Sequence, residues 1–228
     1  MPRTGTVRSG AVATRGDRTR EQLLDVAEQL FGRSGISNVS LRQIRLAAGQ
    51  GNAAAVQYHF GDRDGIVQAI AERHGPRVLA IQAELIDRID VGAGSPVGPL
   101  IDAFVRPSAM YIAIGPSERA WIKMLAELLA DPQISLESLT AGSSDQAVEL
   151  ARRILDHLLV TVPAELAAER MLAVSQFTVH LCADRARVCD DPTSTRRLSS
   201  DEAFAQNLVD MAGGALTAPV THPVEAPT

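Results

Sequence analysis

Carboxamide side chains are the most informative chemical groups in one short, alanine-rich part of the chain. Asn52 and Gln57 lie within residues 46–62, a stretch that contains neither Arg nor Lys. A carboxamide donates and accepts hydrogen bonds at once, so it can pair in bidentate fashion with the edge of adenine. Ala53 is small enough to let the backbone approach a duplex closely. These residues predict a surface that reads DNA bases.

Two short helices must position that surface. Ser40 and Gln43 form a capping-box pattern that starts the first, and Gly49 and Gly51 end it. The second covers about residues 53–60. A longer helix precedes both, starting at Thr19–Gln22. This arrangement is typical of a helix-turn-helix, whose last helix can enter a major groove about 12 Å wide. The residues expected to pack the two short helices are Leu41, Ile44, Ala48, Val56 and Phe60.

The net charge of the chain hides an uneven distribution. All 228 residues together carry −5, which alone argues against binding to nucleic acid. Residues 1–77 hold 11 Arg, no Lys and seven acids and so carry +4, whereas residues 78–228 carry −9. The positive charge therefore flanks the predicted base-reading residues in the sequence. The acidic residues 78–228 are expected to have other partners.

The rest of the chain shows helical periodicity. Apolar residues recur three and four positions apart, as in Trp121, Leu125 and Leu128, and no alternating strand pattern is evident. We therefore predict an all-α protein. Residues 1–18 are expected to form a flexible basic arm, 19–64 the helix-turn-helix domain, 65–216 a helical domain and 217–228 a disordered tail. No signal peptide or apolar run of about 18 residues is present, which favours a cytoplasmic protein without membrane contact.

Residues 40–70 resemble the DNA-binding signature of the TetR family of transcriptional regulators. The matching segments are Ser40–Ile44, Ala48–Gly49, Tyr58–Phe60 and Gly61–Asp64. Two departures from the family pattern stand out. The turn at residues 50–52 is one residue longer than usual, and Arg45 replaces the usual alanine.

The resemblance implies a homodimer with an N-terminal three-helix DNA-binding domain and a C-terminal helical domain for effector binding and dimerisation. It assigns Ser40, Arg42, Tyr58, His59 and Arg63 to phosphate contacts. Alternatives stay open for three of them: Tyr58 as a core aromatic, His59 as a neutral helix-end residue and Arg63 as a solvated turn charge. The full expected DNA-binding set is Ser40, Arg42, Gln50, Asn52, Ala53, Gln57, Tyr58, His59 and Arg63.

The C-terminal domain offers two further sets of candidates, for which burial in an ordinary helical core is the alternative. A mainly apolar effector would contact Phe104, Met110, Tyr111, Trp121, Met124, Phe177 and His180. The dimer would use the last two long helices, about residues 163–188 and 201–216, through Met171, Val174, Leu181, Phe204, Leu208 and Met211. A long helix from about residue 64 to 90, kinked at Gly75–Pro76, would link the effector site to the DNA-binding domain.

The predicted function is a repressor that a small effector releases from a palindromic operator. An activator of the same fold and a helical protein-interaction module are the alternatives. An enzyme is disfavoured because the sequence lacks a recognisable nucleophile–base pair, metal-ligand spacing or phosphate loop, and we expect no cofactor and no metal. The basic arm either follows DNA phosphates or serves as a solubilising tail.

Overall fold

The computed structural model describes residues 14–89, 96–130 and 144–221, and within these ranges the chain contains helices and no strand. The all-α prediction is therefore confirmed. In chain order the helices are α1 (Arg15–Ser34), α2 (Leu41–Ala47), α3 (Ala55–Phe60), α4 (Arg63–Ile86), α5 (Val97–Ile114), α6 (Pro116–Leu128), α8 (Asp145–Leu158), α9 (Ala164–Asp190) and α10 (Asp201–Thr217).

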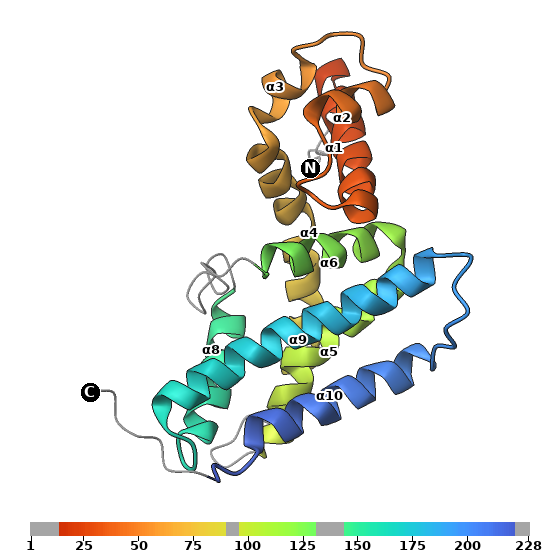
Figure 1. The fold of residues 1–228 in the computed structure, drawn as a ribbon. Coiled ribbons are helices and arrows are strands. Elements are labelled where there is room, and N and C mark those ends of the chain that lie inside the picture. Colours follow the sequence, from red (N-terminus) through yellow and green to blue (C-terminus); the bar gives the residue numbers. More distant parts are fainter. Residues whose placement is uncertain (1–13, 90–95, 131–143, 222–228) are drawn as a thin grey trace, which may run out of the picture.

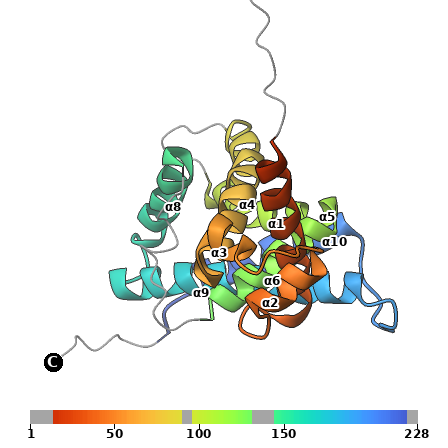
Figure 2. The same cartoon turned by 90° about the horizontal axis from the view of Figure 1, so that it is seen from above.

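The helices form two stacked units, which we call the head (residues 14–62, α1–α3) and the body (residues 96–221, α5–α10). Figure 1 shows the head above the body, with α6 at the boundary between them. Helix α4 leaves the head and continues downward to pack against α5. In the view from above, α1, α2 and α3 lie over α6 and α9 (Figure 2).

The first helix begins earlier than its sequence predicts. The Thr14 hydroxyl accepts a hydrogen bond from the Asp17 amide (3.2 Å), and the Asp17 carboxylate accepts one from the Thr14 amide (2.9 Å). This capping box satisfies otherwise unpaired donors and places an acid in the positive first turn. The start predicted at Thr19 is wrong, because Thr19 lies inside the helix and donates its hydroxyl to the Arg15 carbonyl. Residues 1–13 of the predicted arm lie outside the described residues.

The second predicted cap is confirmed. Ser40 accepts from the Gln43 amide (3.2 Å), and the Gln43 side chain accepts from the Ser40 amide (2.8 Å). The helix-packing residues also occupy the expected positions. Ile44, Ala48 and Val56 are buried, and Leu41 and Phe60 are partly buried against the same core.

Helix α5 lies at the centre of the body and packs against α4, α6, α8, α9 and α10. By length and composition alone it is apolar enough to cross a membrane, with a mean hydropathy of 1.2. Its alternate residues Ile101, Ala103 and Val105 are nevertheless buried among the other helices. The apolar character of α5 is therefore explained by its place in a helical core.

The head and the body touch most closely where α1 crosses α6. A Cβ built at Gly32 would lie 2.6 Å from the Cβ of Ala120, closer than two non-bonded carbon atoms can approach. Glycine at position 32 therefore lets the two helices meet.

Replacing Gly32 by alanine should lower the free energy of unfolding by roughly 1–3 kcal/mol, because α1 and α6 must move apart. Gly75 provides a matched control: it lies inside α4 with open space around it, so Gly75→Ala should stabilise the protein by roughly 0.5–1 kcal/mol. Urea unfolding at one fixed protein concentration measures both. Equal stability of the two variants would contradict the close crossing.

Candidate nucleic-acid interface

Helix α3 lies at the end of the head away from the body (Figure 1), and its Gln57 and Tyr58 side chains are exposed. Tyr58 is 83% exposed, so its alternative role as a core aromatic is wrong. Its ring meets the His59 ring edge-on, with the centroids 5.0 Å apart. Gln57 is exposed, and its carboxamide makes no hydrogen bond to any described residue. Both groups are therefore available to an external partner.

Asn52 is placed differently from Gln57. Its side-chain oxygen already accepts a hydrogen bond from the Ala54 amide (3.0 Å), which shapes the turn before α3. A bidentate contact to adenine needs both the oxygen and the nitrogen of the amide. The geometry therefore favours Gln57 over Asn52 as the base-reading residue.

Arg45 contacts the turn between the two short helices. Its guanidinium donates to the carbonyl of Gln50 (2.7 Å) and also lies 3.4 Å from the carbonyl of Gly51. Gln50 in turn donates its side-chain amide to Gln22 of α1 (3.2 Å). Arg45 thus pairs with carbonyls of the turn at residues 50–52, which links the two departures from the usual pattern in space.

The proposed phosphate-binding residues occupy two kinds of environment. Arg42 and Ser40 are exposed at the start of α2. Arg63 is half-buried and donates to the carbonyl of Val39 (3.1 Å), so its alternative as a solvated turn charge does not hold.

Gly65 allows the tight turn from α3 into α4. A Cβ at this position would lie 1.9 Å from the Phe60 carbonyl oxygen.

A buried polar network joins the head to α4 and to the body. Glu28 of α1 is 2% exposed and His74 of α4 is fully buried. The Glu28 carboxylate lies 2.9 Å from His74 Nε2, and it also accepts from Arg73 (3.2 Å) and from the hydroxyl of Ser117 in α6. This network was not predicted from the sequence. A signal was present, because both residues fall on apolar helix faces: Glu28 lies between Leu24 and Phe31, and His74 lies four residues after Ile70.

The same network reaches into the body through two aromatic residues. The other His74 ring nitrogen, Nδ1, lies 2.7 Å from the Tyr111 hydroxyl, and the imidazole stacks on Trp121 with centroids 5.5 Å apart. Burial raises the pKa of Tyr111 to about 12, so its hydroxyl stays protonated at physiological pH. Arg77 packs over the Tyr111 ring and pairs with the buried Glu118. These contacts fix α4 against α5 and α6.

The pKa of Glu28 reflects two opposing effects. Burial on its own raises the pKa, because a charged carboxylate loses hydration in the core. Hydrogen bonds from His74 and Ser117, together with the positive charge of Arg73, outweigh burial and hold the pKa below its ordinary value of 4.5. Glu28 is therefore ionised at neutral pH, and His74 Nε2 carries the proton that the carboxylate accepts.

The effector candidates do not surround one described cavity. Tyr111, Trp121 and Met124 are buried in the core, and Phe104 and Phe177 pack at its edge. Met110 is 40% exposed on α5. His180 lines a cavity of about 420 Å³ beside α1 and α6, with its Nδ1 2.7 Å from the Gln176 carbonyl.

The residues predicted for the dimer interface also differ in burial: some are buried in the core of this chain and others are partly exposed. Met171, Val174 and Leu208 are already buried within this chain, which is the core alternative left open by the sequence. Leu181 and Phe204 are partly buried, the latter beneath the Arg185 guanidinium. Met211 of α10 is 47% exposed, so it retains the most area for contact with a second copy.

The predicted linker helix is continuous. Helix α4 runs through both Gly75 and Pro76 without a break and ends at Ile86. Residues 90–95, the end of the linker and the start of the glycine-rich loop predicted after it, lie outside the described part of the chain.

Comparison with known proteins supports the resemblance over most of the chain. Residues 23–70 match the profile of bacterial regulatory proteins of the tetR family, and residues 102–215 match that of a tetracyclin repressor-like C-terminal domain. No curated protein sequence matches the chain at a significant level.

Solved structures share the fold at low sequence identity. A bacterial regulatory protein in the tetR family from Rhodococcus RHA1 is 17% identical with a TM-score of 0.53, covering 90% of this chain and 99% of that one. The probable transcriptional regulatory protein RHA5900 is 18% identical with a TM-score of 0.51, covering 88% and 100%. At this identity the likeness concerns the fold alone.

Replacing Glu28 by glutamine should lower the free energy of unfolding by about 3 kcal/mol at neutral pH, because it removes the charge that pairs with His74 and Arg73. The folded-state pKa of Glu28 is depressed, so its contribution is present above pH 4.5 and is lost as the pH falls through that pKa. The stability difference between the two proteins should therefore shrink in acid, as measured by urea unfolding against pH.

Glu149 provides the control for this experiment. Its pKa is also low, about 2, because of hydrogen bonds from Arg152 and Arg153, but it is exposed on α8. Solvent screens such exposed pairs, so Glu149→Gln should change stability far less. A Glu28 difference that persists unchanged in acid would show that the carboxylate charge does not stabilise the junction.

Proposed function

The chain belongs to the TetR family of bacterial regulatory proteins, and from this premise we propose that it is a cytoplasmic repressor that binds a palindromic operator as a homodimer. Members of the family are DNA-binding transcription regulators and not enzymes. A small effector, bound by the body, would release the protein from DNA.

The observation that carries this proposal is the exposed carboxamide of Gln57, which makes no hydrogen bond to a described residue, beside the exposed ring of Tyr58 on α3. Helix α3 presents an amide, which can pair with a base edge, beside a tyrosine and a histidine, which can donate to phosphates. The +4 charge of residues 1–77 supports phosphate contacts around it. In this proposal Gln57 reads a base, while Arg42, Tyr58 and His59 position the helix on the backbone.

The release mechanism would begin at Tyr111 and Trp121. Both contact His74, and His74 is bound to Glu28 of the head. A mainly apolar effector that displaces either aromatic ring would therefore disturb the contacts that hold α4 and α1 in place. A coupling free energy of roughly 1–3 kcal/mol would change operator affinity about 5- to 150-fold.

The proposed homodimer would use exposed parts of α9 and α10. Met211, with the partly buried Leu181 and Phe204, supplies the available apolar area, whereas residues already buried in the chain cannot lose further area on association. Two heads placed by such an interface would meet successive major grooves, about 34 Å apart.

Two substitutions should affect DNA binding in different ways on a duplex selected from a random pool. Gln57→Ala should weaken binding by about 1–3 kcal/mol per lost base contact and relax the preference at one position in each half-site. Arg42→Ala should weaken binding to all duplexes alike and reduce the salt dependence by about one counterion. Fluorescence anisotropy at several salt concentrations measures both effects.

Arg152→Ala is the matched control, because this exposed arginine lies on α8 in the body. It should leave affinity, preference and salt dependence unchanged. Failure of the selection to enrich any sequence would contradict the proposal and favour a protein-interaction module. A reporter gene that falls in expression on addition of the protein supports repression, and one that rises indicates an activator.

A further inference from the structure

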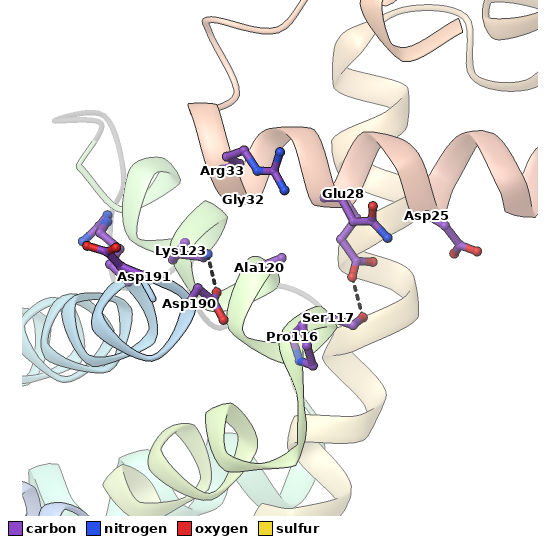
Figure 3. A pocket seen from close by; sticks show the side chains of 12 residues that line it. Asp25, Glu28, Gly32, Arg33, Pro116, Ser117, Ala120, Lys123, Asp190 and Asp191 are labelled. Atoms are coloured by element: carbon purple, nitrogen blue, oxygen red, sulfur yellow. Dashed lines mark hydrogen bonds and ion pairs between the residues drawn. The ribbon is translucent and has the colours of Figure 1, made fainter. Parts of the chain in front are cut away.

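A polar cleft of about 730 Å³ lies between the head and the body, and of its lining residues only Glu28 takes part in the mechanism above. Its walls come from α1 on one side and from α6 and the end of α9 on the other (Figure 3). It shares Gly32, Arg33, Lys123 and Arg187 with the neighbouring cavity of about 420 Å³ that His180 lines. A cleft of this size is large enough for a small molecule.

Each carboxylate that lines the cleft already has a partner within the protein. Asp25 accepts from Arg73 (2.7 Å), and Glu28 is held by the buried network. Asp190 accepts from Lys123 (2.7 Å), an ion pair drawn in Figure 3, and from Arg119 (2.6 Å). Asp191 binds the Thr193 amide and hydroxyl in its own turn. Asp25, Glu28 and Asp190 are therefore paired with cations of the protein, whereas Asp191 accepts from neutral donors.

Two cations of the cleft have no such partner. Arg33, near the end of α1, makes no hydrogen bond or ion pair with a described residue, and the same holds for Arg187 of α9. The pKa of nearby Asp184 is lowered mainly by the hydrogen bond from Arg196, and the charge of Arg187 adds only a minor contribution. One unpaired guanidinium thus stands on the head wall and one on the body wall.

We propose that this cleft binds a small anion bearing carboxylate or phosphate groups, with Arg33 and Arg187 as its main contacts. A guanidinium presents a planar fork of donors that matches both groups in bidentate fashion. Lys123 supplies a third positive charge in the lining of the same cleft, although it already contacts Asp190. The close crossing of Gly32 and Ala120 keeps the two walls near each other.

An anion in this position would tie the head to the body outside the aromatic effector region. Its effect on operator affinity rests on the proposed function, because head placement matters only if the head binds DNA. By linkage, the operator would change the affinity for the anion by the same factor. The binding site itself can be tested without DNA, so failure of the site and failure of the proposed function are distinguishable.

Calorimetric titration of the full chain with inorganic phosphate and with citrate tests the site. Saturable binding of either probe is expected, and Arg33→Ala and Arg187→Ala should each weaken it about tenfold or more, as for loss of a charge-assisted hydrogen bond. Tighter binding of phosphate or of citrate identifies the preferred anionic group.

Arg152→Ala again serves as the control, since it removes one positive charge from the exposed surface of α8 without touching the cleft. All three substitutions are at exposed positions, so circular dichroism should show unchanged folding. Absence of saturable binding for both probes, or equal binding by all three variants and the unaltered chain, would overturn the proposal.

Discussion

The buried carboxylate of Glu28 constrains how the head sits on the rest of the molecule. A charge in a protein core is tolerated only when it is paired and hydrogen-bonded. Its partners come from α4 through His74 and Arg73 and from α6 through Ser117. Any rotation of α1 away from α4 or α6 would leave the Glu28 carboxylate without some of these hydrogen-bond partners. The network therefore favours one placement of the head.

Helix α6 makes further contacts between the body and the head. Ser117 at its start binds Glu28, Ala120 in its middle touches Gly32, and Glu127 near its end accepts from the Ile36 amide (2.8 Å) in the turn between α1 and α2. Trp121 on the same helix stacks on His74. A change in the body that moves α6 would thus act on the head at several points at once, whereas the exposed Gln57 and Tyr58 of α3 lie at the other end of the head.

The sequence predicts local features of this fold well and long-range ones poorly. Capping at Ser40 and the apolar faces of α2 and α3 depend on residues a few positions apart, so their pattern is visible directly. Thr14–Asp17 and Thr19–Gln22 are similar cap patterns, and only the structure distinguishes them. Periodicity places Glu28 and His74 on buried faces, but it cannot show that two residues 46 positions apart meet.

For the candidate sites, too, the sequence predicts what depends on neighbouring residues but not what depends on long-range contacts. Exposure of Tyr58 and Gln57 follows from a short helix whose apolar residues are already assigned to the core, so α3 could be identified as the accessible helix. Met171 and Leu208 have the spacing of an interface and of a core alike, and only packing reveals their burial within one chain. The cleft at Arg33 and Arg187 joins positions from opposite ends of the sequence, which no local pattern reveals.

Hydroxyl-radical footprinting on a duplex selected from a random pool tests the central claim most directly, that two copies of this head read DNA in a fixed arrangement. We predict two equivalent protected segments related by a two-fold axis, with centres about 34 Å apart or a multiple of that distance. A single protected segment, or uniform protection along the duplex, would contradict it.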